Sequence, residues 1–287
     1  MVSRTNTLGL RHLGRACWLG VFCDHYDNLN KLKIVLFFYN SSFFVLRKFA
    51  KTAKDIVLLH SSDIHVDDGF TARANEGDGT NPLRDVLRTA AKVNADIVLL
   101  VGDVFEHNRL ADDIISKAAK IMGDAARHVV ALPGNHDPAT PDSPWRHQSM
   151  GAADKLHIIG VTHKRAILFP EFDLEIWGRA HYDYDDMNPL AKPLRRKTRW
   201  QVALAHGHYE PVADRRTALR ASWLFDDAEL DATGADYVAL GHWNRPIRVG
   251  KGVVPAYYSG SPDLAKTVNI IRLTAGGEVK VKRQKLS

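Results

Sequence analysis

The chain has 287 residues, of which 45% are hydrophobic and 25% charged, and this composition excludes a fibrous or wholly disordered chain. The net charge of +6 comes from residues 1–54, which hold nine Lys or Arg and two Asp, whereas residues 55–287 hold 30 basic and 31 acidic residues. Charge therefore gives no argument that residues 55–287 bind nucleic acid. Both cysteines, Cys17 and Cys23, precede residue 55, which excludes a disulfide scaffold and a thiolate metal site in the remainder.

The first segment, residues 1–54, shows no helical or strand period. Its apolar run from Ile34 to Leu46 is interrupted by Asn40-Ser41-Ser42 and is shorter than the roughly 18–20 residues that span a bilayer. We expect residues 1–54 to be a basic N-terminal extension outside the fold, with a signal anchor or an organellar presequence as the alternative. We expect residues 55–287 to form the functional domain of a cytoplasmic protein without a membrane span.

Residues 55–137 alternate between short aliphatic runs and amphipathic segments. Buried parallel strands are predicted by three uninterrupted runs, at 56–60, 97–101 and 128–132. Between them, residues 82–93 and 110–126 carry apolar side chains at helical spacing, and Pro82 takes the first helical position. This order predicts a parallel sheet with right-handed crossovers.

The second half of the chain shows the same mixture with weaker periods. Strands are predicted at 156–159, 166–169, 172–177, 202–205 and 237–240. A short helix is predicted at 226–232, and the polar, basic stretch 179–199 is expected to be a surface helix and loop. The tail alternates between polar and apolar residues at 253–258, 268–273 and 279–282, which favours antiparallel strands of a second sheet.

Polar side chains stand where five of these predicted strands end. They are Asp63 and His65, Asp103, Asn135 and His136, His206 and His208, and His242. One histidine after a strand is usually a hydrogen-bonded loop residue, but five such ends meet at one edge if the strands are parallel. Carboxylate, amide and imidazole groups without thiolates are ligands for Mn, Fe, Mg or Zn.

The same residues resemble the motif series of the calcineurin-like metallophosphoesterases in order and spacing. The matching motifs are Asp63-x-His65, Gly102-Asp103-x-x-Glu106, Gly134-Asn135-His136-Asp137, the strand-end His206 and Gly241-His242. The resemblance covers most of residues 55–287 and implies an α/β fold, a four-layer αββα sandwich of two mixed sheets with helices outside. Within the superfamily the chain most resembles the SbcD-type DNA repair exonucleases, on residues 102–106, 237–242 and 256–262.

The resemblance implies a site with two divalent metal ions, for which we expect Mn, with Fe, Zn or Mg as alternatives. It makes Asp103 the bridging ligand, assigns Asp63 and His65 to the first ion, and assigns Asn135, His206 and His242 to the second. His136 is implied to stabilise or protonate the leaving-group oxygen. Glu106 is implied to orient the His136 imidazole.

The chain departs from the family pattern at one ligand. The family has Gly-His-x-His, whereas this chain has Gly241-His242-Trp243-Asn244. An amide oxygen at Asn244 can ligate a metal, but more weakly than imidazole, so we expect a weaker first ion or a water in its shell. His208 is a candidate to compensate, with a phosphate-facing or surface loop position as the other interpretation.

The resemblance implies a metal-dependent phosphoester hydrolase that cleaves a phosphodiester by a metal-bound hydroxide. Its expected substrate is DNA, with an ATPase partner subunit by analogy with the exonuclease branch. A small-molecule phosphodiesterase and a protein phosphatase stay open, and Asn244 also leaves open a degenerate scaffold that binds a partner without catalysis. Further candidates for substrate contact are Tyr182, Tyr184, Trp243 and the basic cluster of Arg195, Arg196, Lys197, Arg199, Arg215, Arg216 and Arg220.

Overall fold

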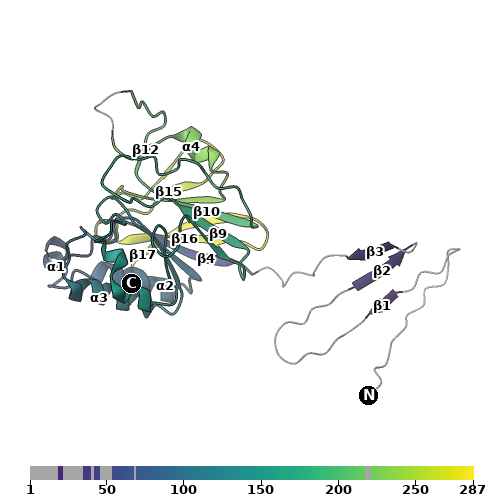
Figure 1. Cartoon of the computed structure of the whole chain (residues 1–287), viewed down its shortest axis with the longest axis horizontal. Coiled ribbons are helices and arrows are strands. Elements are labelled where there is room, and N and C mark those ends of the chain that lie inside the picture. The colour runs from purple at the N-terminus through teal and green to yellow at the C-terminus, as the bar shows by residue number, and fades with distance from the viewer. Residues whose placement is uncertain (1–18, 22–34, 40–41, 46–53, 68, 217–220) are drawn as a thin grey trace, which may run out of the picture. The chain divides into compact units, whose positions relative to one another are not determined.

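The computed structural model describes residues 19–21, 35–39, 42–45, 54–67, 69–216 and 221–287 (Figure 1). The chain divides into two compact units, Met1–Lys54 and Asp55–Ser287. In the first unit β1 (Leu19–Val21), β2 (Val35–Tyr39) and β3 (Ser42–Val45) form an antiparallel sheet in the order β1-β2-β3. The sequence showed no strand period here because the apolar run from Ile34 is split between two short strands. Cys17 and Cys23 lie outside the described residues.

The second unit contains two six-stranded sheets, and the first has the order β17-β16-β4-β5-β6-β7. Four of its strands are parallel: β4 (Ile56–Ser61), β5 (Ile97–Val101), β6 (His128–Leu132) and β7 (Leu156–Ile158). Two antiparallel strands complete it: β16 (Thr267–Leu273) and β17 (Val279–Lys285). Its connections contain α1 (Phe70–Ala74), α2 (Asn81–Lys92) and α3 (Asp112–Gly123), followed by η1 (Pro144–Arg146) and η2 (Gln148–Ala152).

The second sheet has the order β14-β15-β13-β10-β9-β8. Its parallel strands are β9 (Leu174–Gly178), β10 (Trp200–His206), β13 (Tyr237–Gly241) and β15 (Ala256–Tyr258). Its antiparallel edges are β8 (Ala166–Phe169) and β14 (Ile247–Val249). A separate pair of short strands is β11 (His208–Tyr209) and β12 (Leu224–Phe225), and the remaining helices are α4 (Asp227–Ala232) and α5 (Pro262–Ala265).

The two sheets pack face to face, and alternate residues of one strand enter different cores. Ile56 and Leu58 of β4 contribute to the core between the sheets, whereas Val57 and Leu59 pack on the side of α2 and α3. This is why β4, β5 and β6 read as uninterrupted aliphatic runs: both faces are buried. A third core lies on the outer face of the second sheet, where α4 begins at the predicted Asp226 with a capping box.

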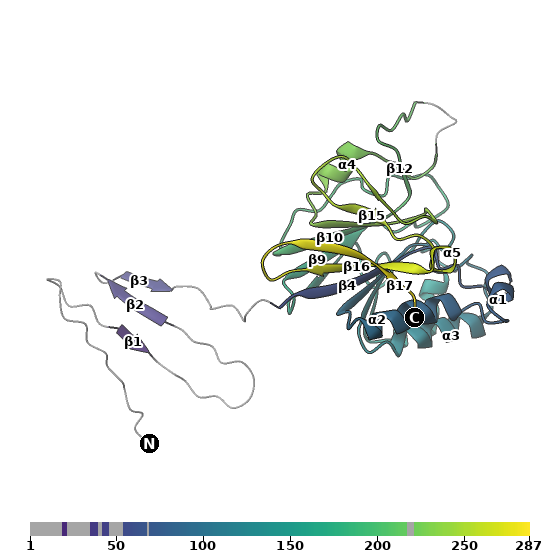
Figure 2. The ribbon, with the colours of Figure 1, turned by 180° about the vertical axis from the view of Figure 1, so that it is seen from behind.

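Figure 2 shows the resulting layers, with α2 and α3 on one side of the sheets and α4 on the other. The predicted α/β sandwich of two mixed sheets with helices outside is confirmed. Among the described residues, no helix has the length and apolar character that a membrane crossing demands.

Two sequence predictions were wrong at the level of elements. The tail strands β16 and β17 extend the first sheet instead of forming part of a second one, because a period of two marks a half-buried strand without naming its partner. In the stretch 179–199 the structure has no helix. That stretch lacks an apolar face of helical period, and Pro189 and Pro193 interrupt it.

Candidate metal centre

The candidate site lies where strands from both sheets end. Strands β4, β5 and β6 of the first sheet lead into Asp63, Asp103 and Asn135, and β10 and β13 of the second sheet end at His206 and just before His242. The sequence prediction placed these ends on one sheet edge. The structure instead brings two edges together, because the two sheets face each other through a common core.

The backbone at these positions is held in a conformation that non-glycine residues rarely adopt. The φ angle is 53° at Asp63, 54° at His65, 51° at Asp103 and 106° at His242. Hydrogen bonds between the two loops hold it there: the Asp63 N–H donates to the Gly102 carbonyl at 3.0 Å and the His65 N–H to the Asp103 carbonyl at 3.0 Å. Such conformations cost on the order of 1–3 kcal/mol each and gather at functional sites.

Asp137 organises the loops beneath the site. Its carboxylate is fully buried and accepts backbone N–H groups of four residues at 2.7–3.2 Å: Asp103, Val104, Phe105 and Gly134. It therefore ties the loop after β5 to the loop after β6. Sequence reasoning gave Asp137 no role, although its place directly after Asn135-His136 in the motif was the available signal.

Glycine precedes three of the site residues because another atom occupies the space of a Cβ. A Cβ on Gly102 would lie 2.0 Å from His206 Nδ1, one on Gly134 would lie 2.2 Å from Asp103 Oδ1, and one on Gly241 would lie 1.9 Å from the Val101 carbonyl oxygen. These approaches let the side chains of the two sheets meet.

At the centre of the group His206 contacts Asp103. His206 Nε2 lies 3.0 Å from Asp103 Oδ2 and 3.1 Å from Asn135 Oδ1, while Nδ1 donates to the Val101 carbonyl at 2.9 Å. This second bond fixes the ring so that Nε2 faces the carboxylate, which is the usual arrangement of a metal-binding histidine. Burial opposes the charged imidazole, but the negative charge of Asp103 raises the pKa of His206 to about 9.

Two buried carboxylates give the site its charge. Burial raises the pKa of Asp63, and the charge of Asp103 adds to this, while both Asp63 oxygens accept the His242 N–H at 3.1 Å. For Asp103 burial also acts upward, but the His206 charge outweighs it and lowers the pKa. Burial, with the positive charge of His206, lowers the pKa of His242 to about 4.

The ligand atoms of these residues form groups of the size that a cation requires. Within each group the atoms lie within 4.8 Å of one another, and the groups are Asp63 with His65 and Asp103, Asp103 with His206 and His242, and His65 with Glu106 and His136. Buried carboxylates are costly unless a cation balances them. The donor set therefore fits divalent metal ions, and the assignment of each ligand to an ion stays a prediction.

Glu106 and His136 lie together, but in a different relation from the predicted one. The Glu106 carboxylate lies 2.7 Å from His65 Nδ1 and 3.5 Å from His136 Nδ1. His136 Nδ1 instead has the backbone carbonyl of Glu106 at 3.0 Å, and the His136 N–H donates to Asp103 Oδ1 at 2.9 Å. The Glu106 side chain thus orients the candidate ligand His65, and its main chain orients His136.

Asn244 is not drawn into the group. It is exposed, and its side chain makes no hydrogen bond to the residues that the structure describes. Its neighbour Trp243 turns inward and stacks on Tyr258, with 4.6 Å between ring centres. The interpretation of Asn244 as a ligand therefore gains no geometric support.

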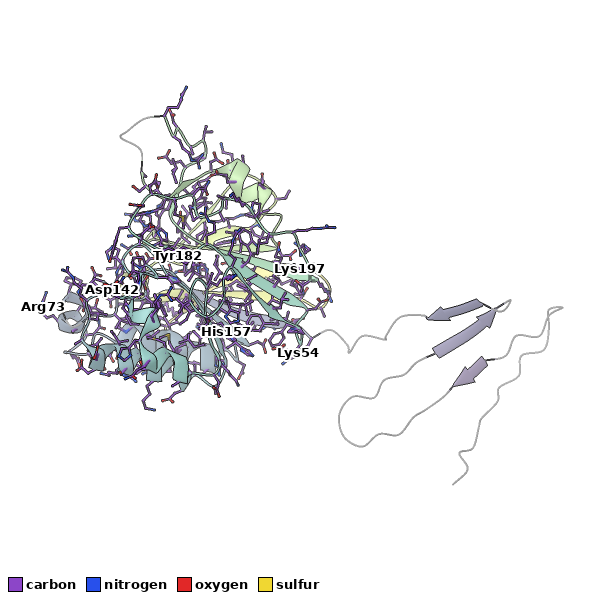
Figure 3. The ribbon with its side chains drawn as sticks, in the orientation of Figure 1. Lys54, Arg73, Asp142, His157, Tyr182 and Lys197 are labelled. Carbon is purple, nitrogen blue, oxygen red and sulfur yellow. The ribbon has the colours of Figure 1, made fainter. Side chains whose placement is uncertain are left out.

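The other candidates for substrate contact separate into two places. Tyr182 and Tyr184 follow the carboxyl end of β9 and are 51% and 61% exposed, so they lie at the edge that carries the site. Arg196 and Lys197 precede β10 and lie at its opposite end; Figure 3 labels Lys197 and Tyr182 well apart. Arg196 also pairs with Asp236 at 2.5 Å, so this basic cluster is a paired surface away from the site. Arg220 lies outside the described residues.

Buried carboxylates and histidines at glycine-preceded strand ends of an αββα sandwich define a class of protein, the metal-dependent phosphoester hydrolases. The family model for calcineurin-like phosphoesterases matches residues 56–246, and the chain belongs to this family. The chain is 23% identical over 266 aligned residues to the SbcD subunit of the nuclease SbcCD from Bacillus subtilis (strain 168). That match covers 77% of this chain and 67% of the relative.

Solved structures agree on the fold. TT1561 of Thermus thermophilus superposes with a TM-score of 0.53 at 10% identity, over 81% of this chain and 99% of that one. A candidate 5'-nucleotidase of Staphylococcus aureus superposes with a TM-score of 0.52 at 14% identity, over 81% of this chain and 54% of that one. At these identities the likeness concerns the fold alone.

Proposed function

We propose that this phosphoester hydrolase cleaves phosphodiesters in nucleic acid and uses two divalent metal ions, Mn in the first place. The observation that carries the proposal is the group around Asp103, in which buried acids and histidines from five strand ends meet within 4.8 Å of one another. A family member at 23% identity that is named as part of a nuclease supports the choice of a phosphodiester.

In this proposal Asp103 lies between the two ions, because its carboxylate belongs to both of the adjoining ligand groups. Asp63 and His65 hold the first ion, and the second is held by Asn135, His206 and His242. Bound ions of this kind neutralise phosphate oxygens and activate water as a nucleophile. The neutral Asn135 amide limits the negative charge of the site, so that a phosphate anion is still attracted.

His136 is proposed to protonate the leaving-group oxygen. Its Nδ1 faces the Glu106 carbonyl at 3.0 Å, which directs the other ring nitrogen, Nε2, to be the proton carrier. The half-exposed position of His136 leaves that nitrogen within reach of a substrate. Glu106 acts on the other side by fixing the ring of His65.

The relative's printed name also makes it one part of a larger nuclease, and the SbcD resemblance implies an ATPase as the partner. We therefore include an ATPase among the proposed partners of this chain, together with a phosphoester substrate such as DNA. A cytoplasmic location is proposed on the same basis.

The proposal is tested by hydrolysis of bis-p-nitrophenyl phosphate with Mn²⁺ and with chelator, for the wild type and Asp103→Asn. We expect Mn²⁺-dependent hydrolysis that Asp103→Asn abolishes. No activity above that variant would instead support a non-catalytic scaffold. Linear and closed circular DNA then separate an exonuclease, which degrades only the linear form, from a small-molecule phosphodiesterase, which degrades neither. p-Nitrophenyl phosphate cleaved in preference to the diester would support a phosphatase.

A further inference from the structure

Trp243 is held in a fixed orientation beside the site. Its ring is stacked on Tyr258 with 4.6 Å between centres and an interplanar angle of 7°. The Tyr258 hydroxyl in turn donates to the Gly207 carbonyl at 2.7 Å. The indole N–H of Trp243 consequently has one direction, and it donates to His208 Nδ1 at 3.2 Å.

This bond determines where His208 carries its proton. An indole nitrogen only donates, so His208 Nδ1 is the acceptor and the neutral imidazole is protonated on Nε2. Within the described part of the chain Nε2 makes no hydrogen bond, and it is not among the buried polar atoms. His208 therefore presents an N–H donor to solvent.

The donor lies next to the proposed metal ligands. The His208 ring is 6.2 Å from the His242 ring between centres, and His208 follows His206 by two residues at the end of β10. A metal ligand needs a lone pair, and in this tautomer Nε2 has none. His208 is thus unsuited to replace the histidine that the family pattern has at Asn244.

We propose that His208 is a phosphate-binding residue, which donates its Nε2–H to a non-bridging oxygen of the substrate, and that Trp243 is the positioning residue that fixes the donor tautomer. The inference rests on the proposed function, since it names a contact to the same substrate. A neutral donor suits this place, because a hydrogen bond to a charged oxygen contributes binding without adding cationic charge beside the ions.

The tautomer is tested directly in the metal-free protein. Long-range proton–nitrogen correlation spectra of protein with ¹⁵N-labelled histidine distinguish Nε2–H from Nδ1–H. We expect His208 in the Nε2–H form in the wild type and a mixture of both forms in Trp243→Phe, which keeps a ring on Tyr258 but removes the N–H. The Nδ1–H form in the wild type would overturn the inference.

The contact is tested by calorimetric titration, first with Mn²⁺ alone and then with inorganic phosphate in the presence of Mn²⁺. We expect His208→Ala to weaken phosphate binding about tenfold, His208→Gln to retain part of it, and Trp243→Phe to weaken it about twofold, because half of the rings carry the wrong tautomer. Binding of Mn²⁺ is expected to be unchanged in all three variants.

Two results would contradict the inference: phosphate affinity unchanged in His208→Ala, or Mn²⁺ affinity lowered as much as phosphate affinity, which would make His208 a ligand. Both titrations can be done on a protein that hydrolyses nothing. A wild type without hydrolysis but with these binding results would therefore contradict the proposed function and leave the His208 contact standing.

Discussion

At Gly134 the space for a single carbon decides whether the site forms. A Cβ there would lie 2.2 Å from Asp103 Oδ1 and 2.5 Å from the Asp103 backbone nitrogen. We expect Gly134→Ala to lose about 1–3 kcal/mol of unfolding free energy and most of its Mn²⁺ affinity. Urea unfolding and Mn²⁺ calorimetry measure both quantities.

The matched control is Gly151→Ala in η2, where a Cβ would meet no atom within 4 Å. This variant should unfold within about 0.5 kcal/mol of the wild type and bind Mn²⁺ equally well. Equal behaviour of the two variants would show that the close approach at Gly134 has no consequence.

Asn244 permits a gain-of-function prediction. The variant Asn244→His restores the Gly-His-x-His pattern, and imidazole is a stronger ligand than an amide for Mn, Fe and Zn. If the proposed first ion is the weaker one, the variant should tighten the weaker of two binding events by about tenfold. Calorimetric titration with Mn²⁺ measures this; an unchanged isotherm would mean that residue 244 does not face the ion.

Residue identities at the strand ends could be predicted because acids, amides and histidines after buried aliphatic runs are unusual there and carry metal-binding chemistry. Asp137 and Trp243 could not be assigned in this way. Their contributions are hydrogen bonds to backbone N–H groups 30 or more residues away and to a histidine on another strand, and no local sequence signal encodes such partners.

Among the elements, β4 and β13 are joined across the two sheets by a buried histidine. His60 is fully buried, and its ring nitrogens contact the Tyr237 hydroxyl at 3.0 Å and the Leu240 carbonyl at 3.2 Å. Burial lowers the pKa of His60 to about 3 from its ordinary value of 6.5. The folded state therefore keeps this ring neutral at pH values where the unfolded chain protonates it.

This difference predicts a loss of stability on acidification. Below pH 6.5 the unfolded chain binds a proton at His60 and the folded chain does not, so stability falls by up to about 1.4 kcal/mol per pH unit until pH 3. His60→Gln does not titrate there, and its unfolding free energy should depend less steeply on pH between 6.5 and 4.5. Parallel curves for the two proteins in urea unfolding would argue against this account.

The elements with strong periods were predictable, and their pairing was not. Strands β5 and β8 and helix α4 lie where aliphatic runs or a capping residue placed them. Sheet membership of β16 depends on its contact with β4, which lies more than 200 residues earlier. Long-range pairings of this kind depend on the whole core, which a local pattern does not contain.

For the whole molecule we propose that Asp55–Ser287 is the functional domain. All of the proposed site residues, and all three apolar cores, come from residues 56 onward. A protein of residues 55–287 should therefore unfold at the same urea concentration as the full chain and hydrolyse bis-p-nitrophenyl phosphate at the same rate. A chain that precipitates or loses activity without residues 1–54 would assign that segment a part in the fold or the reaction.

The most direct measurement is anomalous diffraction from crystals of the protein grown with Mn²⁺. The account predicts two anomalous peaks about 3.5–4 Å apart, one on each side of the Asp103 carboxylate, the first beside Asp63 and His65 and the second beside Asn135, His206 and His242. Mn²⁺ peaks elsewhere on the molecule, or none at Asp103 at saturating metal, would contradict it.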